Sequence, residues 1–207
     1  MQRDGVRTGN EFDVNRYFSI LTHLSMQAGY ELDYVYLSEF LGSQPILYAK
    51  PVGTMHLTYA EYRKTVDGDE FRDLESKYLD YIQADGTPEG FFELAVLRTL
   101  GGQFYLGWHA NYNDATIIAD REALERLLAS YPKVGFWLPL DTQIRARFLR
   151  LEPSVEIGND TVEVKFVIFT KWGGFLQESY TISRAFPHRI LNEEHTTLIE
   201  YDCGLNF

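Results

Sequence analysis

The sequence has one cysteine, no long hydrophobic run and fewer basic than acidic residues, and each shortage excludes a class of protein. Cys203 alone cannot form an internal disulfide, which excludes the disulfide-stapled secreted domains. No apolar segment approaches the roughly 20 residues of a membrane span. The charged N-terminus has no apolar stretch behind it, as a secretory signal would. We therefore expect a cytoplasmic protein.

The charge balance argues against polyanionic partners. The chain has 19 basic and 30 acidic residues, and its net charge is −11. Such a surface repels nucleic acid and anionic membranes, so we expect neither as a partner. Residues 67–93 alone carry nine acids and two bases. This segment is either a solvated helix face, which we favour, or a docking surface for a basic protein.

Linear enzyme signatures are also missing. The sequence contains no GxGxxG, no Walker loop, no GxSxG elbow and no CxxC or HExxH spacing. We therefore expect no cofactor and no metal. The absence of motifs lowers the expectation of an enzyme without removing it, because many hydrolytic sites have no linear signature.

What the sequence does have is the composition of a packed globule, with 45% hydrophobic and 15% aromatic residues in 207. Residues 1–10 contain two glycines and no apolar pattern, which predicts a loose tail. No low-complexity linker divides the remainder. We expect one domain over residues 11–207, and an N-terminal subdomain ending near Gly86 is the alternative.

The clearest structural pattern is a long antiparallel hairpin over residues 162–184, with glycines at its turn. A three-residue loop, Trp172-Gly173-Gly174, pairs Phe166 with Tyr180 and Val164 with Ile182, which makes one face of the hairpin largely apolar. Gly174 suits the left-handed position that closes such a loop.

The other segments alternate between helical and strand patterns. Apolar spacing and capping residues predict helices over residues 14–28, 58–66 and 120–130. They also predict a helix that is capped by Asp67, carries apolar residues from Phe71 to Ile82 and ends before Gly86. Alternation predicts strands over residues 30–37, 46–49, 116–119, 134–138, 143–151 and 196–201. Residues 91–109 read as a second hairpin around Gly101-Gly102, although Thr87-Pro88-Glu89 would also open a helix. Helices early and strands late predict an α+β fold with a mostly antiparallel sheet.

The densest polar cluster is the segment WHANYND, residues 108–114, where a strand ends in a loop. His109 is the candidate general base, oriented by Asp114. The candidate ligand-binding side chains beside them are Trp108, Asn111 and Asn113. The opposing interpretation is a plain turn, because Asn and Asp bond their own backbone in turns.

A second cluster near the C-terminus contains His188, Glu193, Glu194 and His195, with Cys203 beyond. These are zinc-ligand types, but their spacing matches no known zinc motif. We interpret the two histidines as exposed loop residues. Whether they meet in space is not decided by the sequence.

Two further sets are candidate binding residues. Arg145 and Arg147 share a face of a predicted strand and could hold a phosphate or carboxylate, although pairing with the acidic segment is the favoured interpretation. Tyr34 and Tyr36 share a face of another strand, where tyrosines suit either a binding groove or a core.

Three hypotheses for the function follow. The first is a module that binds a small ligand or a protein partner. The second is a small hydrolase-like enzyme that uses His109 with Asp114. The third is a homo-oligomer whose sheet edge or tyrosine face forms the interface. A binding module requires a cavity of at least about 300 Å³.

Overall fold

The chain folds into antiparallel sheets with helices packed on them, which confirms the predicted α+β class. The structure is a computed structural model that describes residues 9–36, 44–65, 76–107, 110–112, 114–131 and 137–204. The α-helices are α1 (Tyr59–Thr65), α3 (Pro88–Leu100), α4 (Arg121–Ser130) and α5 (Leu140–Ala146). Short 3-10 helices are η1 (Val14–Ser19), η2 (Lys77–Tyr81) and η3 (Ala110–Tyr112).

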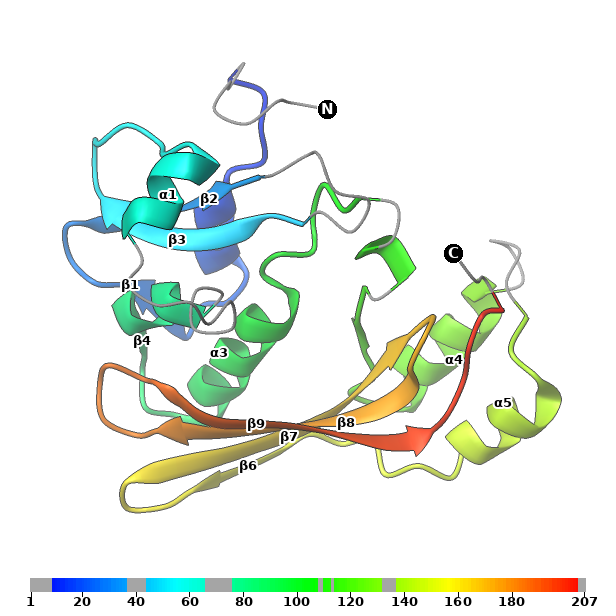
Figure 1. Cartoon of the computed structure of the whole chain (residues 1–207). Coiled ribbons are helices and arrows are strands. Elements are labelled where there is room, and N and C mark those ends of the chain that lie inside the picture. The colour runs from blue at the N-terminus through cyan, green and yellow to red at the C-terminus, as the bar shows by residue number, and fades with distance from the viewer. Residues whose placement is uncertain are drawn as a thin grey trace.

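The strands form one large sheet and two small ones. The large sheet has the order β5-β7-β8-β9, and β6 also pairs with β7. Its strands are β5 (Thr116–Ile117), β6 (Ser154–Ile157), β7 (Thr161–Thr170), β8 (Gly174–Ser183) and β9 (Ile190–Ile199). The two small sheets pair β1 (Leu24–Met26) with β4 (Ile82–Ala84), and β2 (Tyr30–Val35) with β3 (Ile46–Pro51). Figure 1 shows the small sheets and α3 over one end of the large sheet, with α4 and α5 at the other end.

The hairpin of β7 and β8 forms as predicted, with a correction of the register. The loop is Lys171-Trp172-Gly173, and Gly174 begins β8 with φ at +79°. The apolar face and the left-handed glycine are therefore confirmed. Each residue, however, pairs two positions away from the prediction, so Phe166 pairs with Glu178 and Val164 with Tyr180.

Strand β9 contains two irregularities that shift its pairing with β8. One lies between Thr181 and Ile182 of β8, and the other between Phe175 and Leu176. The stretch of β9 between them runs from residue 192 to residue 197. Within it, Glu193 and His195 lie opposite Tyr180 and Glu178. β-bulges re-aim side chains in this way, and here they turn polar residues of β9 toward the face that carries the main core.

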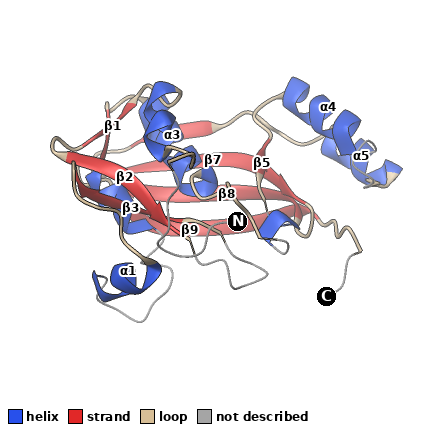
Figure 2. Ribbon diagram, turned by 90° about the horizontal axis from the view of Figure 1, so that it is seen from above, coloured by secondary structure: helices blue, strands red, loops and turns tan. Residues whose placement is uncertain are grey.

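Each face of the large sheet is covered at one end of the sheet, and the two faces are covered at opposite ends. The first core gathers buried residues of α3, the small sheets and one face of β7 and β8, including Leu94, Val164 and Phe166. The second core gathers α4, α5 and the opposite face, including Leu124, Val167 and Phe169. Figure 2 shows the two groups of helices well separated over the strands.

The predicted helix over residues 14–28 is wrong after its first turns. Asp13 does cap η1, because its carboxylate accepts a hydrogen bond from the Asn15 amide. The chain then leaves the helix, and Leu24–Met26 pairs with β4 as β1. The pairing of β1 with β4 also contradicts the end of the predicted helix that carries residues 71–82, because Ile82 belongs to β4. Residues 71–75 of that helix lie outside the described residues. Tertiary strand pairing overrides the local helical spacing in both segments.

The predicted second hairpin is also wrong, since residues 88–100 form α3. Thr87 caps this helix by accepting a hydrogen bond from the Gly90 amide, and Pro88 occupies the first turn. The apolar residues of α3 face both the large sheet and the N-terminal half, so the helix lacks the amphipathic spacing that would reveal it. Among the described residues that follow α3, 101–107 contain no strand.

The predicted strand over residues 143–151 is a helix, α5, followed by a turn. Thr142 and Ala146, one helical turn apart, are the buried residues that fix it against the sheet. The predicted strand over residues 134–138 lies mostly outside the described residues. Two further helix starts are confirmed. Thr58 and Glu61 form a reciprocal capping box at α1, and Asp120 caps α4.

Within the described ranges, every helix is too short or too polar to cross a membrane.

Candidate functional site

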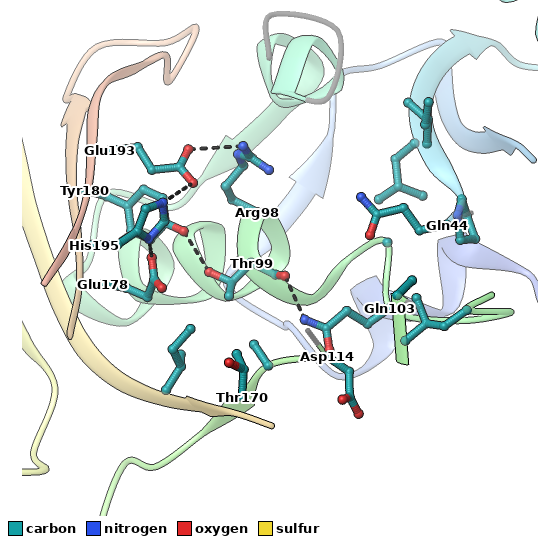
Figure 3. Close-up of a pocket in the computed structure, with 18 of the residues that line it drawn as sticks. Gln44, Arg98, Thr99, Gln103, Asp114, Thr170, Glu178, Tyr180, Glu193 and His195 are labelled. Atoms are coloured by element: carbon teal, nitrogen blue, oxygen red, sulfur yellow. Dashed lines mark hydrogen bonds and ion pairs between the residues drawn. The ribbon is translucent and has the colours of Figure 1, made fainter. Parts of the chain in front are cut away.

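A cavity of about 480 Å³ opens between the C-terminal end of α3, the large sheet and the start of β3. One wall is apolar, with Ile46, Leu47, Leu106 and Ile168. The other wall is polar and is drawn in Figure 3. Its functional groups come from α3 and from neighbouring strands of the sheet, and they are Arg98, Thr99, Glu178, Tyr180, Glu193 and His195. Segments far apart in the sequence therefore meet in one concave site.

Glu178 is the least expected member of this wall. Strand β8 alternates, and its inward face consists of Leu176, Glu178, Tyr180 and Ile182. The side chain of Glu178 therefore enters the apolar face opposite Phe166, and only 2% of the residue is exposed. Burial of the carboxylate raises its pKa above the ordinary value of 4.5, although the nearby His195 opposes this shift.

His195 lies directly across the strand pair from Glu178. Its Nδ1 atom is 2.6 Å from Oε2 of Glu178, a short contact of the charge-assisted kind. The histidine side chain is 55% exposed, whereas that of the glutamate is 3% exposed. A buried carboxylate therefore holds the orientation of a solvent-accessible imidazole.

Glu193 completes the charged row two residues before His195 on β9. Its Oε2 accepts a hydrogen bond of 3.1 Å from Nη2 of Arg98, and its Oε1 lies 3.8 Å from Nε2 of His195. Arg98 comes from the last turn of α3, where a cation also complements the helix dipole. Figure 3 shows His195 between the two glutamates.

A neutral hydrogen-bonded chain continues the polar wall. Thr99 donates its hydroxyl proton to the Ala95 carbonyl at 2.9 Å, so the hydroxyl of Tyr180, 3.0 Å away, donates to Thr99. Burial raises the pKa of Tyr180 above its ordinary range, which keeps it a neutral donor. Gln103 donates its amide to the Thr99 carbonyl at 3.1 Å. Donors and acceptors thus alternate along the wall.

The predicted catalytic pair is only partly described. Asp114 lines the cavity, and its carboxylate binds Nζ of Lys171 at 2.5 Å. The same lysine donates to the Asn111 carbonyl. Trp108, His109 and Asn113 lie outside the described residues. The roles of His109 and Asp114 in catalysis, and of the neighbouring residues in ligand binding, therefore stay predictions.

The tyrosine and arginine candidates lie away from the cavity wall. Tyr34 and Tyr36 belong to the first core, and the ring of Tyr34 packs edge-on against Phe104 at 4.8 Å. Arg145 is exposed on α5, while Arg147 forms a bidentate pair with Glu125 of α4, at 2.7 and 2.8 Å. Because residues 140–146 are helical, the two arginines do not share a strand face. Arg147 pairs as favoured, but with α4 rather than with residues 67–93.

The C-terminal cluster is divided by the structure. Glu193 and His195 point into the cavity, whereas Glu194 faces the other side of β9 and accepts a hydrogen bond from Asn192. His188 is buried near Phe91, and Cys203 bonds through its backbone to Lys171. The interpretation of the histidines as exposed loop residues is therefore wrong for His188, which is buried, and His195 is exposed but lies on strand β9.

Glu178, Tyr180 and Arg98 are members of the site that the sequence did not single out. One signal was present for Glu178, because it is the single charged residue on the inward face of β8. The comparisons add no further assignment. Neither protein-family models, nor curated proteins, nor solved structures give a significant match to this chain.

Proposed function

We propose that this protein binds a small molecule in the cavity between α3, β3 and the large sheet. The observation that supports the proposal is the cavity itself, whose volume of about 480 Å³ lies within the range of small-molecule sites, about 300–1,000 Å³. Its two unlike walls, one apolar and one hydrogen-bonding, are also typical of such sites.

The walls favour a ligand with an apolar body and one polar end. Arg98 and Gln103 offer N–H donors, the Tyr180 hydroxyl oxygen offers an acceptor, and Glu193 offers a carboxylate. The guanidinium and that carboxylate already neutralise each other, so a ligand of high charge gains little here. A polar group that both donates and accepts hydrogen bonds fits the wall best, and the aliphatic wall covers the rest of the molecule.

Filling the cavity tests this proposal. Ala110 lines the cavity, so Ala110→Trp places an indole in it, whereas Ala129→Trp places the same group on the exposed face of α4. Ligand-observed NMR with a library of small heteroaromatic alcohols and amides measures binding. We expect hits whose saturation-transfer signal persists with Ala129→Trp and falls at least tenfold with Ala110→Trp. Hits that bind all three proteins equally, or no hits at all, would count against a cavity ligand.

A further inference from the structure

The gap between His195 and Glu193 has the geometry of a site for a metal ion. Nδ1 of His195 is engaged by Glu178, and Oε2 of Glu193 is engaged by Arg98. The two atoms that face each other, Nε2 and Oε1, lie 3.8 Å apart, which is too far for a hydrogen bond. We propose that a divalent transition-metal ion, of the Zn²⁺ or Mn²⁺ class, binds between these two atoms.

The separation matches two coordination bonds. Zinc lies about 2.0–2.1 Å from a histidine nitrogen and about 2.0–2.2 Å from a carboxylate oxygen. Two such bonds that meet at an angle of about 130° span the observed gap, so the ion enters without a large movement of either side chain. The candidate ligand atoms of Glu178, Glu193 and His195 all lie within 4.8 Å of one another.

Glu178 occupies the position that a carboxylate usually takes when it orients a metal-binding histidine. Such histidines usually donate their second ring N–H to a carboxylate, which fixes the tautomer and makes the other nitrogen a better ligand. Here, with Nδ1–H donating to Glu178, Nε2 keeps a free lone pair and lies 3.8 Å from Oε1 of Glu193. The burial of this carboxyl group, of which only 2% is exposed, is an observation separate from the gap.

The local charge also favours a cation. Two carboxyl groups, those of Glu178 and Glu193, lie beside one guanidinium, that of Arg98. Lys171 and Asp114, on another part of the wall, neutralise each other. Arg98 contacts the far oxygen of Glu193 and so balances that carboxylate without occupying the gap.

The ligand types select the metal class. One imidazole nitrogen with one carboxylate oxygen suits zinc, manganese, iron or cobalt better than calcium, which takes six to eight oxygens. The exposed side of His195 faces the cavity, so the remaining coordination positions are open to water or to a ligand oxygen. In this last respect the inference rests on the proposed small-molecule function, whereas the metal site itself does not.

Isothermal titration with ZnCl₂ alone tests the site on protein stripped with a chelator. We expect one ion per chain, at least a hundredfold weaker binding with His195→Ala, and at least tenfold weaker binding with Glu193→Gln. Glu178→Gln keeps the side-chain shape but loses the orienting charge, so the affinity should fall about 10–100-fold. Co²⁺ should give a visible absorption band that Zn²⁺ abolishes.

His23 supplies the matched control. Its Nδ1 contacts Asp85 at 2.8 Å, which reproduces the histidine–carboxylate contact on the surface of the protein. His23→Ala should leave the zinc affinity unchanged, and circular dichroism should show that every variant is folded. Equal affinity in wild type and His195→Ala, or a loss of affinity with His23→Ala, overturns the proposal.

The titration is independent of the ligand screen. Zinc binding without any cavity ligand would support the metal site and count against the proposed function. The reverse result would leave Glu178, His195, Glu193 and Arg98 as an ion-pair network in a ligand-binding wall.

Discussion

Glu178 carries a carboxylate into the apolar face of β8, where a hydrophobic residue would fill the same space. A buried ion pair adds little net stability, because the desolvation of the charge offsets its attraction to the partner. Its partner, His195, remains more than half exposed. Packing alone therefore does not account for this glutamate, which is the reason to assign it to a site.

The raised pKa of Glu178 predicts how stability depends on pH. Above 4.5 the unfolded chain releases this proton, while the folded chain retains it until the raised pKa is reached. Within that window the folded state binds more protons, so the contribution of Glu178 to stability falls as the pH rises. Glu178→Gln removes the dependence. Urea unfolding at about pH 5 and about pH 8 should show wild type losing stability relative to this variant at the higher pH.

The opposite trend would be informative. If wild type gained stability relative to Glu178→Gln as the pH rose, the His195 imidazolium would outweigh desolvation and the pKa of Glu178 would be lowered. In that case, adding His195→Gln to wild type and to Glu178→Gln should abolish the difference in pH dependence between them, because the imidazolium would be absent from both.

At the scale of elements, the turn of the main hairpin is fixed by one glycine. Gly174 has φ at +79°, and a Cβ there would overlap the Ile199 carbonyl and approach the Tyr201 amide nitrogen at 2.6 Å. Gly53 has the same φ, with nothing within 4 Å of the added carbon. The two sites therefore share backbone strain and differ only in crowding.

This difference predicts unequal costs for the same substitution. Gly53→Ala should lower the free energy of unfolding by about 1 kcal/mol, the cost of a left-handed alanine. Gly174→Ala should cost about 3 kcal/mol or more, because the end of β9 must also move. Urea denaturation measures both. Equal losses of unfolding free energy would show that the end of β9 can move beside the turn at little cost.

Elements that depend on local signals were predictable from the sequence. The caps at Thr58 and Asp120, and the alternation of β7 and β8, fixed α1, α4 and the main hairpin correctly. The predictions were wrong for residues 88–100 and 140–146, because contacts with segments distant in the sequence decide which of their side chains are buried. α3 is buried on more than one side, and α5 carries exposed apolar residues such as Leu140 and Ile144, which blurs its helical spacing.

The site was harder to predict than the fold. His195 and Glu193 were noticed as metal-ligand types, but their partner Glu178 lies on another strand. That partnership depends on the pairing of β8 with β9, whereas the last strand was predicted over residues 196–201, which excludes both Glu193 and His195. The contribution of Arg98 depends on α3, which was predicted as a strand. A site assembled across strands and a helix requires the pairing, and linear spacing does not contain it.

At the scale of the whole molecule, strands of the large sheet join the two cores, and β7 is the clearest case. β7 sends Val164 and Phe166 into the first core, and Val167 and Phe169 into the second. Unfolding of one core would therefore remove packing contacts from the other core. The expectation of a single domain stays a prediction, and this shared strand is the reason to expect one cooperative unfolding transition.

Paired core substitutions test that expectation. Leu94 and Leu124 are fully buried, one in each core, so replacing either by alanine should cost about 2–5 kcal/mol. Calorimetry should show one transition in each variant, shifted to lower temperature as a whole. Two separated transitions, only one of which moves with each variant, would divide the chain into two domains. The homo-oligomer likewise stays a prediction. Light scattering tests it, because a solution mass equal to the chain mass of 24.0 kDa would contradict it.

The two irregularities in β9 have a consequence for how this protein can change. They reset the in–out alternation of the strand, so that Ile190 and Ile199 keep their places in the two cores while the stretch between them follows its own phase. Substitutions at residues 193 and 195 can therefore alter the chemistry of the cavity without moving the hydrophobic ends that anchor the strand. Relatives with the same cores would then be free to bind different ligands.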